Sequence, residues 1–319
     1  MPNLLRFFLF CLLAAIAGAA WAEAGTACPP VAVQPTPEAV QAGMRNARDH
    51  GFLWRISRDG RTSYLYGTLH VAKPEWMYPG PEVMQALREA DTVALELDML
   101  NPDIRGRLAA GMAALPNAPL PEHLTKRLRK QADAVCVPYE TLAALTPELQ
   151  IVTLTVMTAR WEGLDASYGI DSVLAGIGHG AKKNVVSLET PEAQLKMLEM
   201  EDAQESIATV QDGLAELETG GARKLLKRIA QVWASADYAA MARYGEWCDC
   251  LNTQTEREMM KRMLDDRNPG LAAGIDDIHA DGKQVFAAVG SLHMFGPFGL
   301  PALMAKRGYR VERVDLHPR

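Results

Sequence analysis

The chain has 319 residues, a net charge of −6 and 23% charged residues, a length that fits one large or two small domains. This acidic balance offers no basic surface for DNA or RNA, so we expect no nucleic-acid partner. Residues 1–22 run from Arg6 through an apolar stretch to Ala20-Trp21-Ala22, the layout of a cleavable secretory signal peptide. We therefore expect a periplasmic or secreted protein with no stable membrane span after cleavage.

The segment after the signal peptide, residues 23–48, is rich in Ala and Pro, which predicts a flexible lead-in. The mature chain keeps four cysteines, an even number that favours disulfide bonds in an oxidising compartment: Cys28, Cys136, Cys248 and Cys250. A bond between Cys248 and Cys250 would close a very tight ring. We therefore expect these two to pair separately with Cys28 and Cys136, in an order that the sequence leaves open. A metal site on Cys-x-Cys lacks further ligands at zinc-finger spacing.

The first regular part of the chain predicts a β-hairpin. Two β-rich runs, residues 52–56 and 63–66, flank the turn sequence Asp59-Gly60. The second run ends at Gly67-Thr68-Leu69-His70, which places His70 at or just after the end of a strand.

A helix and a buried strand follow the hairpin. Residues 83–90 carry apolar side chains on one face of a proline-opened helix, and residues 92–97 form a buried strand with one carboxylate. Residues 102–265 have mainly helical propensity and are interrupted by prolines. Within them, residues 184–189 predict one further strand, which ends in a second carboxylate.

The C-terminal part repeats the early organisation. Residues 284–289 predict a strand, Gly290-Ser291-Leu292-His293 follows it, and a helix over 300–306 leads to a last strand over 309–314. Both units have the order strand, Gly-x-Leu-His, proline-bearing loop, helix, strand. We therefore predict an α/β (α+β) fold with a central mixed sheet built from two such halves and a large helical insertion, about residues 102–265.

Four polar side chains fall at the carboxyl ends of predicted strands: His70, Glu96, Glu189 and His293. Ligands of open α/β sheets bind at this edge, so we expect all four to converge on one crevice and to be catalytic. Neutral imidazoles and carboxylates are ligands for Mn²⁺, Co²⁺, Fe²⁺ or Zn²⁺, and such an ion lowers the pKa of its bound water towards about 7. The pattern predicts a divalent metal ion held by His70, Glu96 and His293.

Structural interpretations compete with this one. A histidine after a strand can be a hydrogen-bonded structural residue, and Glu189 can cap the helix that Thr190-Pro191 opens. Asp171 is favoured near a helix start by the helix dipole. Ser291 suggests a nucleophile, but the G-x-S-x-G motif is absent. The remaining histidines are interpreted as surface or loop residues: His50, His123, His179, His279 and His317.

Taken together, the motifs resemble the TraB/GumN/PrgY family over about residues 52–315. The segments that carry the resemblance are Tyr64-Leu65-Tyr66-Gly67-Thr68-Leu69-His70, Val93-Ala94-Leu95-Glu96, Tyr168-Gly169-Ile170-Asp171, Leu188-Glu189-Thr190, Arg267-Asn268 and Val289-Gly290-Ser291-Leu292-His293. The resemblance implies that residues 49–319 form one TraB/GumN-like domain, with a fold shared with Tiki-type peptidases and, more remotely, with erythromycin-esterase-like and ChaN-like proteins. In the Tiki branch, two Gly-x-x-His motifs and acidic residues are held to form a divalent-metal peptidase centre.

Carried to this chain, the resemblance assigns two sets of residues. The ligands or general base are His70, His293, Glu96 and Glu189. The substrate-binding residues are Arg267, Asn268, Tyr168 and Asp171. We predict a metal-dependent hydrolase of peptidase type, which acts on a small peptide or an envelope-derived substrate. The alternative is a non-catalytic periplasmic protein that binds or sequesters a peptide or a polysaccharide-related ligand.

Overall fold

The structure is a computed structural model that describes residues 28–117, 119–200 and 202–316. The predicted signal peptide, residues 1–22, and His317 lie outside these residues. In the part of the chain that is described, no helix has the length and hydropathy needed to cross a bilayer.

The described residues contain one mixed sheet with the strand order β4-β3-β5-β2-β1-β6. Its strands are β1 (Phe52–Arg58), β2 (Arg61–Thr68), β3 (Thr92–Leu95), β4 (Asn184–Ser187), β5 (Val285–Gly290) and β6 (Arg310–Val314). Strand β1 pairs antiparallel with both β2 and β6, whereas the other neighbours pair in parallel. The predicted α/β (α+β) class with a central mixed sheet is confirmed.

The hairpin of β1 and β2 also agrees with the sequence. Arg58 pairs with Arg61, and the two turn residues both have positive φ, 52° at Asp59 and 74° at Gly60. Such a turn follows the right-handed twist of the strands, and Asp-Gly is among its preferred sequences.

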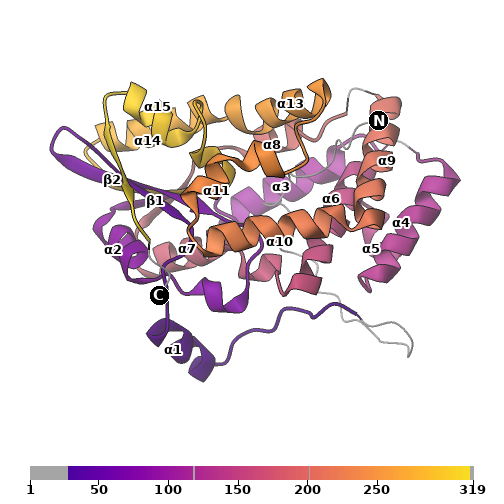
Figure 1. The fold of residues 1–319 in the computed structure, drawn as a ribbon, viewed down its shortest axis with the longest axis horizontal. Helices are drawn as coiled ribbons and strands as arrows, with labels where there is room; N and C mark the ends of the chain where they lie inside the picture. The colour runs from indigo at the N-terminus through magenta and orange to yellow at the C-terminus, as the bar shows by residue number, and fades with distance from the viewer. Residues whose placement is uncertain (1–27, 118, 201, 317–319) are drawn as a thin grey trace.

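Two crossovers start from neighbouring strands at the centre of the sheet. Strand β2 continues through α2 (Pro81–Glu89) to β3, and β5 continues through α15 (Leu300–Lys306) to β6. In Figure 1, α15 and α14 (Asn268–Ala280) lie on one side of the sheet, whereas α2 and α7 (Ile170–Gly180) lie on the other. Ligand crevices form where neighbouring strands connect to opposite sides of a sheet. In this fold that place lies between β2 and β5.

The predicted insertion contains most of the remaining helices. These are α3 (Pro102–Ala114), α4 (Glu122–Ala134), α5 (Tyr139–Leu142), α6 (Pro147–Thr158), α8 (Pro191–Lys196), α9 (Ala203–Thr219), α10 (Gly221–Ala234), α11 (Tyr238–Ala242), α12 (Tyr244–Trp247), α13 (Gln254–Met260) and the π-helical turn η4 (Lys261–Asp265). Short 3-10 turns are η1 (Pro74–Met77), η2 (Ala159–Glu162), η3 (Ala166–Tyr168) and η5 (Ser291–Met294).

The insertion has an apolar core of its own. Leu124, Leu154 and Leu214, from α4, α6 and α9, are completely buried there. Figure 1 shows these helices at the opposite end of the long axis from the hairpin. The amphipathic helix α10 extends back towards the sheet, where Leu225, Ile229 and Trp233 join the main core. The insertion thereby covers the edge of the sheet at which the parallel strands end.

The described part of the predicted lead-in, residues 28–48, contains a helix and makes contacts with the rest of the protein. It contains α1 (Pro37–Arg45), whose first turn has a proline and whose N-terminus is capped by Thr36. Ahead of this helix, the Tyr168 hydroxyl accepts a hydrogen bond from the Val33 amide at 2.7 Å and lies 3.1 Å from the Val33 carbonyl oxygen.

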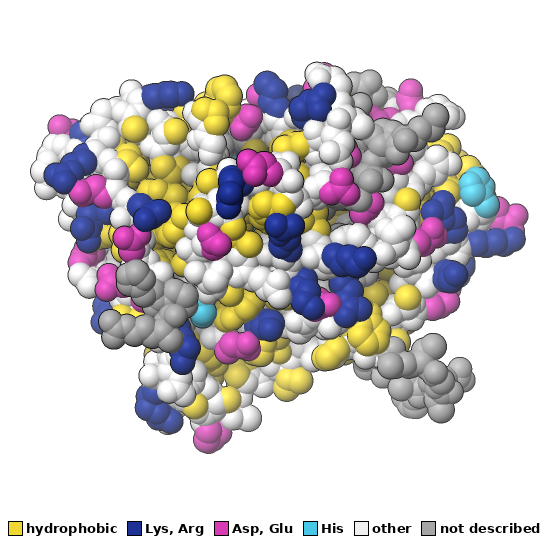
Figure 2. Space-filling model, in the orientation of Figure 1, with side chains coloured by type: hydrophobic (Ala, Val, Ile, Leu, Met, Phe, Trp, Pro, Cys, Tyr) yellow, Lys and Arg dark blue, Asp and Glu magenta, His cyan; other side chains and the backbone are white. Residues whose placement is uncertain are grey.

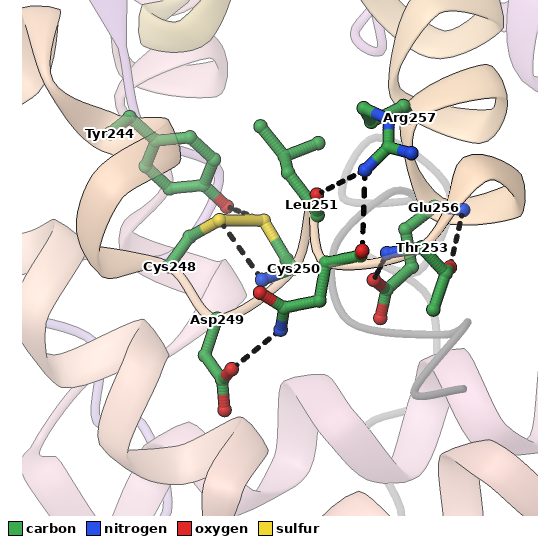
Figure 3. The surroundings of a disulfide bond; sticks show 9 residues. Tyr244, Cys248, Asp249, Cys250, Leu251, Thr253, Glu256 and Arg257 are labelled. Atoms are coloured by element: carbon green, nitrogen blue, oxygen red, sulfur yellow. Dashed lines mark hydrogen bonds between the residues drawn. A yellow bond between two sulfur atoms is a disulfide. The ribbon is translucent and has the colours of Figure 1, made fainter. Parts of the chain in front are cut away.

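The predicted cysteine pairing is wrong: Cys28 bonds Cys136, and Cys248 bonds Cys250 (Figure 3). Asp249 adopts a φ of 53°, so the chain reverses between the two neighbouring cysteines. Aspartate tolerates this left-handed conformation better than most residues do. The Cα atoms of Cys248 and Cys250 therefore lie 5.1 Å apart, within the usual range of about 4.4–6.8 Å.

His279 was predicted to lie on the surface or in a loop, and this prediction is also wrong. Its side chain projects from the last turn of α14 and is completely buried, with Nδ1 2.9 Å from Ser63 Oγ and Nε2 3.1 Å from the Arg58 carbonyl oxygen. Both ring nitrogens are thus satisfied by the hairpin, which makes His279 a structural residue.

Candidate functional site

Three of the predicted site residues meet at the carboxyl ends of adjacent strands. Thr68 of β2 pairs with Gly290 of β5, so the two Gly-x-Leu-His segments leave the sheet side by side. Strand β3 flanks β5 on its other side and leads into Glu96. A Cβ atom built on Gly290 would lie 3.1 Å from Glu96 Oε1, 3.4 Å from His70 Nε2 and 3.6 Å from His293 Cδ2. The structure therefore brings both histidines and Glu96 around one point.

Each imidazole ring is held through its Nδ1 atom. His70 Nδ1 lies 2.6 Å from Asp171 Oδ2, and His293 Nδ1 lies 2.6 Å from Asn268 Oδ1. Asn268 donates its Nδ2 hydrogen to the Phe298 carbonyl at 2.8 Å, so its oxygen accepts from His293. Both rings consequently present Nε2 to the Glu96 side of the site, and His293 Nε2 is 4.0 Å from Glu96 Oε1.

Arg267 links the two carboxylates of the site. Its Nη2 atom donates to Glu96 Oε2 at 2.5 Å and also to Glu189, and its Nε atom donates to Glu189 Oε1 at 2.8 Å. Its Nη1 atom lies 3.1 Å from His293 Nε2. The Arg267 side chain is only 12% exposed and that of Glu96 only 5%, so solvent only weakly screens the attraction between their charges. The buried carboxylate of Glu96 and the partly buried carboxylate of Glu189 thus share one guanidinium.

These charges set the protonation of the centre. Burial alone would raise the pKa of Glu96, but the nearby Arg267 guanidinium, both histidines and the Gly290 amide together lower that pKa. Burial lowers the pKa of His293 to about 3; the neighbouring Glu96 carboxylate opposes this shift, whereas Arg267 and His70 add to it. The centre therefore combines an ionised carboxylate with a neutral imidazole at His293.

The three residues line a cavity of about 110 Å³, which has a polar floor and an apolar wall. The wall comes from the insertion: Met197, Leu226, Ile229, Ala230, Met263 and Leu264. This wall could not be predicted from the sequence, because amphipathic spacing shows that a helix is packed without showing what it packs against. Gln194, which was not predicted either, is a buried residue whose Nε2 atom donates to Glu189 Oε2 at 3.0 Å.

The fourth predicted catalytic residue, Glu189, does not line the cavity. Its carboxylate accepts hydrogen bonds from Arg267 behind the cavity. It does not cap the next helix: Thr190 is the N-cap of α8, and its hydroxyl accepts from the Ala193 amide at 3.2 Å. The capping interpretation of Glu189 is therefore wrong.

The predicted substrate-binding residues lie in three different places. Arg267 lines the cavity, whereas Asn268 and Asp171 contact the histidines from behind. Tyr168 instead contacts the lead-in through its hydroxyl. The Ser291 hydroxyl donates to the Thr68 carbonyl at 2.7 Å, which joins the two Gly-x-Leu-His segments.

The donor atoms suit a divalent metal ion in their chemistry. Histidines that bind metals through Nε2 usually donate Nδ1–H to a carboxylate or amide oxygen, as both histidines do here. Among the described residues, no group of three or more His, Cys, Asp or Glu side chains that could hold an ion is found. The guanidinium of Arg267 contacts the same Glu96 and His293 side chains that an ion would use.

Comparison with known proteins places the chain in a family. No curated protein and no solved structure matches it. A family model does match, over residues 52–313, which include every residue of the centre described above. The chain belongs to the TraB/PrgY/gumN family.

Proposed function

We propose that this protein is a periplasmic or secreted metal-dependent hydrolase of peptidase type, which acts on a peptide bond through a water bound to a divalent ion. The observation that carries the proposal is the convergence of His70, His293 and Glu96 on one point at the carboxyl edge of the sheet. Each histidine has its Nδ1 atom held from behind, which directs Nε2 inwards. Packing alone gives no reason to place the same Gly-x-Leu-His segment at the ends of two neighbouring strands.

His70, His293 and Glu96 would hold the ion, which can be Mn²⁺, Co²⁺, Fe²⁺ or Zn²⁺. When bound, such an ion polarises a carbonyl group and lowers the pKa of its water towards about 7. The charge balance of the centre favours a cation, because Glu96 and Glu189 share the single positive charge of Arg267. A neutral His293 likewise keeps a lone pair for an ion at ordinary pH.

The residues of the chain have separate roles in this proposal. Asp171 and Asn268 orient the two imidazoles and fix their tautomers. Arg267 keeps Glu96 ionised and lies where a guanidinium can also donate to a substrate carbonyl. Glu96, the carboxylate at the cavity floor, would supply an ionised oxygen ligand to the ion.

The apolar wall of the cavity supports a peptide substrate. It offers a site for an apolar side chain next to the polar centre, and it excludes water from the reacting groups. We propose a small peptide or an envelope-derived peptide as the substrate class.

Metal analysis and peptide digestion test the proposal. Mature protein, residues 23–319, is treated with a chelator and incubated with a peptide library alone and with each of the four ions. We expect cleavage only after ion addition, and a fall in the rate of about 10²–10⁴-fold in His70→Ala and Glu96→Gln. His123→Ala removes an exposed histidine on α4 and serves as the matched control.

The rival function, a binding or sequestering protein, makes a different prediction. Wild-type protein that binds peptides or acidic oligosaccharides in calorimetry, yet cleaves no peptide with any of the four ions, would establish the rival and refute hydrolysis.

A further inference from the structure

Gln194 lines the cavity of the centre but has no role in the proposed metal-dependent step. It lies in α8 and is only 4% exposed. Its Nε2 atom lies 3.0 Å from Glu189 Oε2 and 3.5 Å from Glu96 Oε2. Ionised carboxylates accept hydrogen bonds and donate none, so the NH₂ group of the Gln194 amide has to face them. The two carboxylates thereby fix the orientation of this amide.

The other end of the same amide, the Oε1 atom, is an acceptor without a donor. Among the described residues, no N–H or O–H group donates to it. It is also not among the fully buried polar atoms of the described chain that lack a hydrogen bond, so it borders open space. The open space that Gln194 lines is the cavity. A ligand that brings a donor to this oxygen gains a hydrogen bond, whereas one that covers it without a donor loses free energy.

The other neutral polar side chains of the cavity lining already have partners within the protein. The Thr68 hydroxyl donates to Asp171, and the Ser291 hydroxyl donates to the Thr68 carbonyl oxygen. Both hydroxyls thus help to hold the two Gly-x-Leu-His segments. In the described part of the lining, Gln194 Oε1 is the neutral side-chain oxygen that takes part in no hydrogen bond within the protein.

The surroundings of the cavity favour a neutral donor. Helix α10, which supplies part of the apolar wall, crosses the front of Figure 1. On this face, Figure 2 shows Lys and Arg side chains interspersed with Asp and Glu, so neither sign of charge dominates it. A peptide carries a neutral donor, the backbone N–H, next to each side chain. The apolar wall and the Gln194 acceptor therefore suit one residue of a peptide, with its side chain against the wall and its N–H at Oε1.

We propose that Gln194 is a substrate-binding residue, whose Oε1 atom accepts a hydrogen bond from a backbone N–H of a peptide in the cavity. This assignment deepens the proposed peptidase function and rests on it. It predicts that the protein distinguishes an amide from an ester at one position of the substrate. An ester oxygen replaces the donor by a second acceptor and leaves Oε1 without a partner.

Binding is measured separately from cleavage, by calorimetry on the mature protein, residues 23–319, with a chelator present. The probes are a short apolar peptide and a set of analogues in which each backbone N–H in turn is replaced by an ester oxygen. We expect one analogue to bind wild type about tenfold more weakly than the parent peptide. Gln194→Met keeps the length of the side chain but removes the acceptor, so this penalty should disappear while penalties at other positions remain.

The fold of this variant should be kept, because Arg267 still pairs with both Glu96 and Glu189. Gln194→Leu is a second variant without the acceptor and should give the same result. Gln204→Met, on α9, serves as the matched control: it removes an exposed glutamine that does not line the cavity, and it should keep the penalty.

Equal affinities across the whole set in wild type would overturn the assignment, even if peptides are cleaved, and so would a penalty that persists in both Gln194 variants. A penalty that depends on Gln194, without cleavage in the presence of any of the four ions, would support the assignment and refute the hydrolase. Binding of an oligosaccharide, with no peptide bound, would overturn the assignment to peptides.

Discussion

The two Gly-x-Leu-His segments are alike in sequence and in position, yet their histidines have different surroundings. His70 contacts the carboxylate of Asp171, and its side chain is 18% exposed. His293 contacts the neutral amide of Asn268, and its side chain is 4% exposed. A carboxylate stabilises positive charge that develops on an imidazole, whereas an amide only orients the ring.

The hydroxyl residues inside the two segments also have different hydrogen-bond partners. Thr68 donates its hydroxyl to Asp171 Oδ1 at 2.6 Å and so helps to orient the partner of His70. Ser291, at the corresponding position, donates its hydroxyl across to the Thr68 backbone. The repeated motif therefore provides a common geometry, and the elements packed around each copy determine its chemistry.

The largest expected effect is loss of either histidine. Under the proposed function, His70→Ala and His293→Ala each lower kcat/KM about 10²–10⁴-fold, because each removes a ligand. Their stabilities should differ: His293→Ala leaves the buried Asn268 oxygen without its donor and costs about 1–3 kcal/mol of unfolding free energy. Denaturant unfolding alongside the kinetics measures both effects, and equal stability losses would contradict the comparison.

The two motif glycines should respond differently to an added methyl group. Gly290 has φ −48° and ψ 137°, which alanine can adopt, so Gly290→Ala should fold and lose about 10²-fold in kcat because its Cβ enters the centre. At Gly67 a Cβ would lie 3.2 Å from the Ser291 Cα, so Gly67→Ala should lower stability by about 1–3 kcal/mol. Similar outcomes at both positions would show that the segments are equivalent.

A smaller effect on kcat is expected at Asp171, the hydrogen-bond partner of His70. Asp171→Asn keeps the shape and a hydrogen-bond acceptor but removes the negative charge, and we expect kcat to fall about 10–100-fold with little change in KM. Steady-state kinetics with one cleaved peptide tests this. A variant with unchanged kcat would mean that the carboxylate does no more for His70 than Asn268 does for His293.

The smallest effect is expected at Ser291. Ser291→Ala removes the hydrogen bond to Thr68 and should cost about 1 kcal/mol of unfolding free energy, with kcat changed less than about threefold. A large loss of activity in a stable Ser291→Ala protein would revive the nucleophile interpretation and count against water as the attacking group.

Much of the fold could be predicted from local patterns. The Asp59-Gly60 hairpin, the strand that precedes each histidine and the helical insertion all rest on signals within a few residues of one another. The disulfide pairing could not be predicted in this way, since it depends on the left-handed conformation of Asp249. The short separation of Cys248 and Cys250 in the sequence argued wrongly against a bond between them, because Asp249 turns the chain between the two cysteines.

The candidate site likewise has a part that could be predicted from the sequence and a part that could not. His70, Glu96 and His293 could be placed at strand ends from the sequence, and the parallel pairing of β2, β3 and β5 then brought them together. The role of Glu189 could not be read from its position, since a residue after a strand can face the crevice or hold a neighbour. Its contact with Arg267, 78 residues further along the chain, shows which of the two applies.

The sequence by itself determined the family, the fold class and the residues available for chemistry, because periodicity and turn residues act over short distances. Only the tertiary structure decided which side chain each of these residues contacts. Those contacts join the segments that follow β2, β3 and β5 to the N-terminal ends of α7 and α14, across long stretches of chain. The burial and charge that lower the pKa values of Glu96 and His293 exist only once those elements have packed together.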